Sequence, residues 1–423
     1  MSARRIKILL LASSYPKNRG DSASIFLRQF AETLSARGID VHVLAPSDGK
    51  TDITIEGTVT VHRFQYRPVC FSRGLAYGSG IVANLRQNPW LWFQVPFFLV
   101  SMIFALRRLM RSEQPDVIHA HWILPQGLVA VLIKYLYKVR VIVTAHGADA
   151  FAFRGRVANG LKRFAVAKSD AWTTNTRATG EAIGLAKSLP TPDIIPMGVD
   201  VEQFSGGCPT RLRGELRSDD LLVLFVGRLV EKKGCYDLLE AFSLLRHDLR
   251  ARTSLWIVGQ GAEHDRLDAF ATRLGIHPKV RFWGAVSNHR LPDFYAAADL
   301  FVAPSIRAES GDTEGQGVVL LEAFAARCCV LSTRVGGIAE VITDGATGLL
   351  VEPNAPRQLA GAMESLLGNA SLRNRLAGNA FQRVNSYGWQ KIAAAFEALY
   401  RKVEMPPKAP PDTSGSLASK SSR

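Results

Sequence analysis

The chain has few cysteines, and their spacing excludes two classes of protein. Its 423 residues include five cysteines, at positions 70, 208, 235, 328 and 329. These form no C-x-x-C pair and no even set, so neither a cysteine zinc site nor a disulfide framework is expected. The simplest interpretation is a protein of a reducing compartment, and we expect it in the cytoplasm.

A long apolar run at the start of the chain is also missing. The sequence opens "MSARRIKILLLASSYP", with basic residues before an apolar stretch. That stretch, residues 8–12, is too short for the core of a signal peptide. We therefore interpret it as a first β-strand.

Acidic residues are scarce in one half of the chain. Residues 1–200 contain 25 Lys and Arg against 13 Asp and Glu, whereas residues 201–402 contain 24 against 22, within an overall charge of +15. The first half is therefore the part expected to meet an anionic partner, either a membrane surface or a nucleic acid. No nucleic-acid recognition module is visible, so we expect no nucleic-acid partner. Diffuse solubilising charge is the other interpretation.

The composition that is present, 47% apolar and 21% charged residues, is that of a globular protein, and the length favours two domains. The opening reads strand, loop, helix and strand in "RIKILLLASSYP", "SIFLRQFAETLSARG" and "DVHVLAPSD". A second series of strands and helices begins at "LLVLFVGRLVEKKG". We predict an α/β protein with two doubly wound, Rossmann-like domains that face each other across a cleft.

The predicted boundaries follow changes in composition. Residues 1–190 form the N-terminal domain, the Pro- and Gly-rich residues 191–203 form a linker, and residues 204–385 form the C-terminal domain. A C-terminal helix is predicted over residues 386–402. The Pro- and Ser-rich residues 403–423 are expected to be disordered.

Two basic residues follow the first strand of the second series. In "VGRLVEKKG", Arg228 and Lys233 lie between an apolar strand and a helix that begins near Tyr236. Arg and Lys at this spacing can close on one diphosphate. On its own the segment also fits an exposed charged loop.

Two glutamates occur in "GDTEGQGVVLLEAFAA", residues 311–326. Glu314 and Glu322 are eight positions apart, about 12 Å in a helix, which is too far for the carboxyl pair of a glycosidase. We predict that Glu314 lies in a Gly-rich loop and Glu322 about a turn inside the following helix. Such a loop presents free backbone N–H groups to a phosphate.

Three histidines in the first half are candidates for a site. His146 ends the apolar stretch "VIVTAHGADAF", a good position for a functional residue, although a structural role is equally frequent there. His119 and His121 alternate with apolar residues in "DVIHAHW". We favour packing for His119 and leave His121 open. No third ligand at zinc-like spacing accompanies them, so no metal is expected.

Taken together, these motifs resemble those of a known family. "VGRLVEKKG", "IVGQG", "FVAPS", "EGQGVVLLEA" and "TDGATGLLVEP", preceded by "TAHGAD" and "IIPMGVD", are similar to the segments of retaining nucleotide-sugar glycosyltransferases of family 4. The resemblance extends to about residue 402. It implies the GT-B fold, with acceptor binding in the N-terminal domain and nucleotide-sugar binding in the C-terminal domain.

The resemblance also implies roles for individual residues. Arg228 and Lys233 hold the donor diphosphate, and Glu322 accepts hydrogen bonds from the ribose. Glu314 lies against the transferred sugar, and His146 approaches that sugar from the other domain. The resemblance adds backbone contacts to the donor from Gly315, Gln316, Gly317, Val318 and, in the first loop "SYPKNRGDSAS", Gly20.

The expected activity is therefore sugar transfer. A retaining, metal-independent hexosyltransferase would use a UDP- or GDP-sugar as co-substrate, with no tightly bound cofactor, and a saccharide or lipid-linked acceptor of polysaccharide, lipopolysaccharide or glycolipid assembly. A sugar phosphorylase with pyridoxal phosphate or a nucleotide-sugar epimerase on the same fold is an alternative. A basic, non-catalytic nucleic-acid-binding protein is another.

One apolar segment is a candidate for contact with a membrane. Residues 88–111, "NPWLWFQVPFFLVSMIFALRRLMR", are nearly long enough to span a bilayer, but they fall between strands of one domain. We expect either a helix buried in that domain or one whose aromatic side lies in the lipid interface, with Arg107, Arg108 and Arg111 beside it. The second interpretation makes the protein peripheral on the inner face of the membrane.

Overall fold

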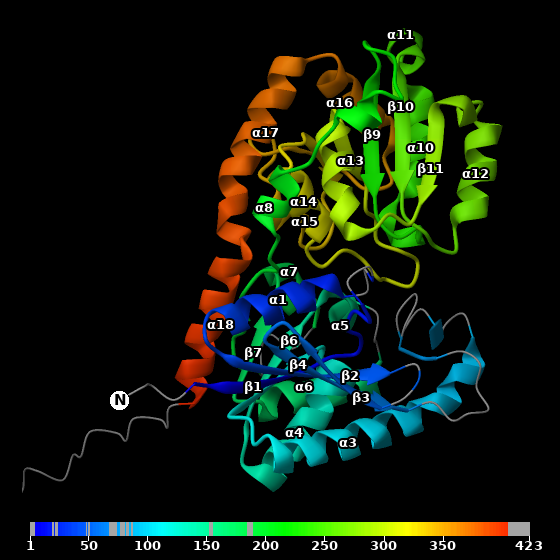
Figure 1. The fold of residues 1–423 in the computed structure, drawn as a ribbon. Coiled ribbons are helices and arrows are strands. Elements are labelled where there is room, and N and C mark those ends of the chain that lie inside the picture. The colour runs from blue at the N-terminus through cyan, green and yellow to red at the C-terminus, as the bar shows by residue number, and fades with distance from the viewer. Residues whose placement is uncertain are drawn as a thin grey trace, which may run out of the picture.

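A computed structural model describes residues 5–18, 21, 24–47, 49, 51–66, 74–76, 81, 84–85, 88–151, 155–183 and 189–404. Gly20, and with it one predicted donor contact, lies outside the described residues, as do residues 405–423 of the predicted tail. Two sheets, each flanked by helices, form two domains stacked one above the other (Figure 1). The predicted α/β fold class is confirmed.

The first sheet has eight strands in the order β3-β4-β2-β1-β5-β6-β7-β8. All its pairings are parallel except that of β3 with β4. The central strands are buried on both faces, as expected of parallel strands between helical layers, and they are largely apolar apart from the two histidines of β5. The strands are β1 (Lys7–Leu11), β2 (Asp40–Ser47), β3 (Asp52–Glu56), β4 (Val59–Gln65), β5 (Val117–His121), β6 (Arg140–Ala145), β7 (Ala171–Thr174) and β8 (Asp193–Ile194).

Helices cover both faces of this sheet. On one face α3, α4 and α6 pack into a core cluster with the strands. On the other, α1 packs against the last helix of the chain. The helical segments are α1 (Ile25–Ala36), η1 (Pro89–Phe93), α3 (Gln94–Ser112), η2 (Ile123–Gly127), α4 (Leu128–Tyr137), α5 (Gly147–Phe151), α6 (Arg156–Lys168) and α7 (Arg177–Ala182).

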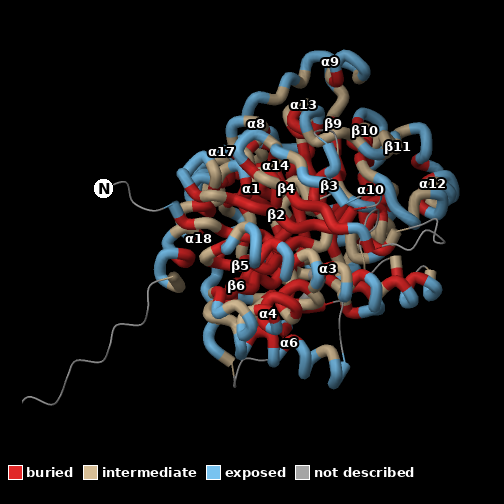
Figure 2. Tube along the Cα trace, turned by 60° about the horizontal axis from the view of Figure 1, so that its bottom comes forward, coloured by how far each residue is buried: buried red, intermediate tan, exposed pale blue. Residues whose placement is uncertain are grey.

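The second sheet has six parallel strands in the order β11-β10-β9-β12-β13-β14. Its buried strands lie between two core clusters, and Figure 2 shows burial concentrated along the strands with exposure at the outer turns. The strands are β9 (Leu221–Val226), β10 (Thr253–Val258), β11 (Val280–Gly284), β12 (Leu300–Ala303), β13 (Val330–Thr333) and β14 (Leu349–Val351).

Between β9 and β14 the helices alternate with the strands, as the sequence pattern predicts. Four of the helical segments are single turns of three residues: η3 (Glu231–Lys233), η4 (His277–Lys279), η5 (Asn288–Arg290) and η6 (Asn385–Tyr387). The others are α8 (Val201–Ser205), α9 (Thr210–Arg213), α10 (Cys235–Leu244), α11 (His247–Ala251), α12 (His264–Arg273), α13 (Leu291–Ala297), α14 (Val318–Ala325), α15 (Ile338–Val341), α16 (Pro356–Leu367), α17 (Ala370–Val384) and α18 (Trp389–Glu404).

The chain crosses between the domains twice, and the crossings touch. Val199 N–H donates to the carbonyl of Tyr387 at 3.0 Å. After the second crossing, α18 returns to the first domain, where its Trp389 Nε1–H donates to Gln29 Oε1 at 3.0 Å. Figure 1 shows α17 and α18 running along one side of both domains. The predicted linker, residues 191–203, includes β8, which extends the first sheet.

Candidate active site

The loop after β9 carries both predicted diphosphate ligands. Arg228 is exposed just past the strand, and Lys233 ends the short η3. Gly234 follows with φ +67°, and a Cβ there would lie 1.8 Å from the carbonyl oxygen of Pro304, beyond the end of β12. Glycine is therefore required for the close approach that seats this loop at the carboxyl edge of the sheet.

Lys233 is paired with the first predicted glutamate. Its ammonium donates to Glu314 Oε2, and both side chains are about one-seventh exposed, at 14% and 15%. The neighbouring Lys232 donates to Asp312 Oδ1 at 3.2 Å instead. Burial by itself would raise the pKa of Glu314, but the charges of Lys233 and Lys232 outweigh burial and lower it to about 2. A fixed pair of opposite charges therefore stands at the two residues for which the family resemblance predicts contact with the diphosphate and the sugar.

The Gly-rich loop enters α14 as the sequence predicts. Gly317 has φ +79° and precedes Val318, the first residue of the helix. The loop packs directly against Gly336. A Cβ on Gly336 would lie only 1.9 Å from the carbonyl oxygen of Glu314, so the two backbones are in contact. The backbone from Glu314 to the start of α14 is thus fixed by contact with the turn after β13.

The second predicted glutamate has a partner that the sequence motif did not indicate. Glu322, one turn inside α14, accepts a hydrogen bond from the hydroxyl of Tyr295 on α13 at 2.8 Å. Burial raises the pKa of Glu322 to about 7, although this hydrogen bond and the charge of Lys233 act in the opposite direction. The Glu322 carboxyl is therefore partly ionised and partly protonated at neutral pH.

The first domain and the chain segment that follows it contact this loop in several places. A Cβ on Gly147 would lie 2.8 Å from the Cα of Gly315, so the two backbones are in direct contact. Thr176 of the first domain donates from Oγ1 to the carbonyl of Gly315 at 2.9 Å. Gln316 exchanges hydrogen bonds with Met197, accepting from its N–H at 2.7 Å and donating to its carbonyl at 3.3 Å. The side chain of Gln316 thus binds the segment that joins the two domains, and the predicted donor contact of this residue is one of its backbone.

His146 directly precedes Gly147, and a stack of buried histidines supports it. His121 Nδ1 and His146 Nε2 are 3.1 Å apart, and one of the two donates. His119 in turn contacts the hydroxyl of Tyr400 at 2.7 Å and Thr144 Oγ1 at 2.6 Å. Burial lowers the pKa of His146 to about 4, so its ring is neutral at pH 7. The packing role favoured for His119 agrees with these contacts, whereas His121 contacts the candidate site residue.

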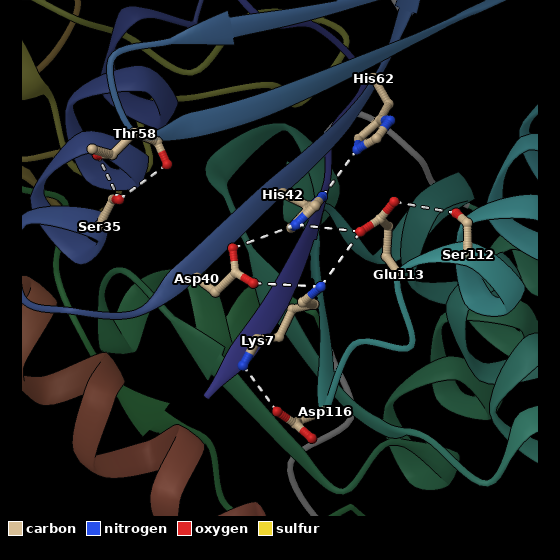
Figure 3. A network of polar contacts seen from close by, with 9 residues as sticks. All are labelled: Lys7, Ser35, Asp40, His42, Thr58, His62, Ser112, Glu113 and Asp116. Atoms are coloured by element: carbon tan, nitrogen blue, oxygen red, sulfur yellow. Dashed lines mark hydrogen bonds and ion pairs between the residues drawn. The ribbon is translucent and has the colours of Figure 1, made fainter. Parts of the chain in front are cut away.

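A separate cluster of metal-ligand type lies at the other end of the first sheet (Figure 3). Among the described residues, His42, His62 and Glu113 place three ligand atoms within 4.8 Å of one another. Lys7 Nζ, however, lies 3.4 Å from carboxylate oxygens of both Asp40 and Glu113. A lysine ammonium therefore already balances these carboxylates. The expectation of no metal stays a prediction.

The structure thus gathers most of the predicted site residues around the domain interface. Lys233, Glu314 and the start of α14 are contiguous, and His146 approaches through its neighbour Gly147. Sequence reasoning missed Tyr295 and Asn175. The Asn175 Oδ1 is buried without a partner among the described residues, beside Gly315. No short motif marks either residue, and only their contacts reveal them.

Comparison with known proteins identifies the family of the chain. The family model "Glycosyltransferase Family 4" matches residues 23–203, and "Glycosyl transferases group 1" matches residues 211–383. The D-inositol 3-phosphate glycosyltransferase of Frankia alni is 33% identical, over 74% of this chain and 81% of its own. The putative teichuronic acid biosynthesis glycosyltransferase TuaC of Bacillus subtilis is 26% identical, over 94% and 99% respectively.

Solved structures show the same architecture. Sucrose-phosphate synthase from Thermosynechococcus elongatus superposes with a TM-score of 0.78 at 22% identity, covering 94% of this chain and 99% of its own. Anabaena HepE, in complex with UDP and glucose, gives 0.72 at 18% identity over 94% and 100%. The fold is therefore GT-B, that of a large class of glycosyltransferases. Within that class, the chain belongs to the glycosyl transferases of group 1, family 4.

Proposed function

We propose that the protein is a retaining glycosyltransferase that moves a hexose from a UDP- or GDP-sugar to an acceptor on the cytoplasmic side of the membrane. The acceptor is a saccharide or lipid-linked intermediate of cell-surface polysaccharide, lipopolysaccharide or glycolipid assembly. TuaC, named for teichuronic acid biosynthesis, supports the polysaccharide assignment. HepE, solved with UDP-glucose, supports the choice of co-substrate.

The observation that carries the proposal is the pair of Lys233 and Glu314 at the carboxyl edge of the second sheet. When a nucleoside diphosphate leaves, negative charge develops on its phosphate oxygens, and a fixed cation stabilises that charge. Glu314 holds the Lys233 ammonium in place before the donor arrives. Arg228, on the same loop, supplies a second positive charge as a planar fork.

The remaining donor contacts follow from α14. Its first turn carries backbone N–H groups and the positive end of the helix dipole, which suit a phosphate. Glu322 lies one turn further along and, when ionised, accepts hydrogen bonds from the ribose hydroxyls. Tyr295 orients that carboxylate from behind.

The first domain contributes His146. Its ring is neutral at pH 7 because burial lowers its pKa to about 4, so it acts by hydrogen bonding to the transferred sugar and not as a cation. His121 sets the orientation of the ring through the contact of 3.1 Å. The transferred sugar then lies between His146 and the backbone of Gly315 to Val318.

Protein cations take the place that a divalent metal fills in other transferases, so we propose that transfer is metal-independent. Activity should persist in EDTA. The phosphorylase alternative requires pyridoxal phosphate, so a pure protein without its visible absorption band would exclude that alternative.

Two measurements test the function. Thermal-shift screening with UDP-, GDP-, ADP- and TDP-sugars should show stabilisation by one base above the others, because a ligand stabilises the state that it binds. With the selected donor, NMR of the product or of the slowly hydrolysed sugar should show that the anomeric configuration of the donor is kept. Stabilisation by none of the donors, or an inverted product, would overturn the proposal.

A further inference from the structure

Exposed apolar side chains are concentrated on one part of the first domain. Sixteen large hydrophobic residues are exposed in the described chain, and twelve of them belong to three segments. Six lie within residues 90–104, three within 132–136 and three within 157–164. Trp90 is 71% exposed and Phe104 is 66% exposed, so these are not residues at the edge of a core. Apolar exposure gathered in this way marks an interaction surface.

The three segments form one continuous surface. They belong to η1 with α3, to α4 and to α6, and α4 packs against both other helices. The helices cover the outside of the first sheet, and Figure 1 shows α3 and α4 on the side of this domain away from the second domain. We call the outward side of residues 90–111, 132–138 and 156–168 the three-helix face.

Helix α3 is apolar on both its inner and its outer side. Phe98, Met102 and Leu106 are buried in the core at intervals of four residues. Phe97 and Phe104 point outward. A helix on a water-exposed surface normally carries charged and polar residues along that side, whereas α3 has only Ser101 there before the arginines of its last turns.

Charge on the three-helix face has one sign. The sequences of α3, α4 and α6 contain eight Lys and Arg and neither Asp nor Glu, and of these eight Lys162 is buried and does not reach the face. Lys134 is paired with Asp170 from outside these helices at 2.8 Å. Arg107, Arg108 and Arg111 line an open hollow of about 500 Å³ with Phe104 and Ser112, and Arg107 and Arg111 also hydrogen-bond the hydroxyl of Tyr137. Three guanidinium groups beside an exposed phenyl ring fit a phosphate that is attached to an apolar chain.

We propose that the three-helix face docks on the surface of an anionic phospholipid membrane. The aromatic residues of η1 and α3 enter the boundary between headgroups and acyl chains, and the hollow formed by the arginines takes a lipid phosphate. An apolar side together with basic residues and no acids is the composition of a helix that lies in this boundary. The inference does not depend on sugar transfer, since the face is remote from Glu314 in the fold.

The helix lies along the membrane and does not cross it. Pro89–Ser112 is long and apolar enough to span a bilayer by length and composition, and only 28% of its most apolar window is buried. Its inner residues, however, pack with β4, β2 and α4, so a crossing would remove part of the core of the first domain. Docking leaves these contacts intact and covers the outward side.

Co-sedimentation of the full chain with vesicles tests the electrostatic part. Binding to phosphatidylcholine vesicles that contain phosphatidylglycerol should exceed binding to phosphatidylcholine alone, and high salt should release the protein. R108E with R111E should lower the partition at least about tenfold, since each basic residue near an anionic surface contributes measurably. The matched control is R217E with R357E, the same charge change at exposed arginines of the second domain, which should bind as wild type. Equal loss in both variants would overturn the assignment to this face.

Tryptophan fluorescence tests the apolar part. Vesicle binding should shift the emission to shorter wavelength, and W90F with W92F should remove most of that shift while binding persists. F97S with F104S should lower the partition about tenfold or more, because two phenyl groups lose their transfer from water. Melting temperatures and nucleotide-induced thermal shifts of these variants should match wild type, which excludes misfolding.

Three results would overturn the proposal. The first is no sedimentation with anionic vesicles at low salt. The second is a dimer in sedimentation equilibrium that F97S with F104S dissociates, because a second copy would then cover the face. The third is wild-type protein that resists release by both salt and carbonate, which would indicate a span. None of these outcomes bears on donor binding, so failure of docking and failure of the proposed transfer are distinguishable.

Discussion

Gly147 and Gly315 touch backbone to backbone across the interface of the two domains. A Cβ on either residue would lie 2.8 Å from the Cα of the other, a distance that Cβ atoms essentially never show. The residues that precede them are His146 and Glu314, so the contact fixes how closely the two candidate site residues approach each other. This contact leaves no room for a side chain between the two halves of the site.

Alanine at either glycine should therefore separate the two halves by a fraction of an ångström. We expect G147A and G315A each to lower kcat/KM by about tenfold to a hundredfold, because misplacement on this scale costs about that much. Binding of the nucleoside diphosphate, which involves the second domain, should change little in G147A. Calorimetry and steady-state kinetics measure the two effects.

Gly378 provides the control for these variants. It lies in α17, and a Cβ there would meet nothing within 4 Å. G378A should keep full activity and raise stability by about 0.5–1 kcal/mol, as alanine for glycine does in a helix. Full activity in G147A and G315A would show that the observed contact is not part of the active arrangement.

Removal of the two cations should impair transfer without unfolding the protein. K233A and R228A should each lower kcat/KM by on the order of 10² to 10³, the usual effect of losing charge stabilisation of a leaving group. K233A also leaves the Glu314 carboxylate without its partner, so its melting temperature should fall more than that of R228A. R357A, at an exposed position on α16, controls for the loss of a positive charge. Activity within a few-fold of wild type in both variants would remove the residues from the site.

How far the sequence could predict this molecule depends on the range of the interactions involved. Buried parallel strands are continuous apolar runs, so the two sheets could be anticipated from segments such as Leu221–Val226. The proximity of Lys233 and Glu314, 81 positions apart, followed from resemblance to a family, since no local pattern encodes it. Contact between distant segments is a property of the fold.

Other features could not be predicted from the sequence because they also depend on contacts between distant segments. The return of α18 to the first domain depends on Phe396 packing against Phe30, with ring centroids 4.9 Å apart, and an amphipathic helix does not indicate which sheet it covers. Tyr295 lies 27 positions before Glu322 on a different helix. The sequence of residues 88–111 left both burial and lipid contact open, and the structure buries one side of this segment and exposes the other.

Substitutions of Glu314 and Glu322 should differ in their effect on nucleotide binding. E322Q should weaken binding of the free nucleoside diphosphate, because its proposed partner is the ribose. E314Q should leave that binding nearly intact and still suppress transfer, because its proposed neighbour is the sugar. Calorimetry with the bare diphosphate decides the question, and equal losses in both variants would show that the assigned roles are wrong.

Affinity for the donor should depend on pH through Glu322. With a pKa of about 7, this carboxyl is mostly ionised at pH 8 and mostly protonated at pH 6. If the ionised form binds ribose, affinity for the nucleotide sugar should fall about tenfold over this range. A sugar diphosphate ester has no ionisation of its own there.

Two variants test this pH dependence. E322Q should show weak binding with a flat profile. Y295F removes a hydrogen bond to the ionised form, so the midpoint should move to higher pH. An unchanged wild-type profile between pH 6 and 8 would contradict the assignment.

The pair of Lys233 and Glu314 should appear in the stability of the protein at low pH. Because the pKa of Glu314 is lowered from 4.5 to about 2 in the folded state, the pair stabilises the fold fully above pH 4.5 and progressively less as pH falls toward 2. A shift of this size corresponds to on the order of 3 kcal/mol. Relative to wild type, E314Q should therefore be most destabilised at pH 7 and less so near pH 3.5. E309Q, an exposed glutamate of the same loop, controls for the change in charge. Melting temperatures of the three proteins at both pH values give the comparison, and an equal deficit of E314Q at both would mean that ionisation of Glu314 does not stabilise the fold.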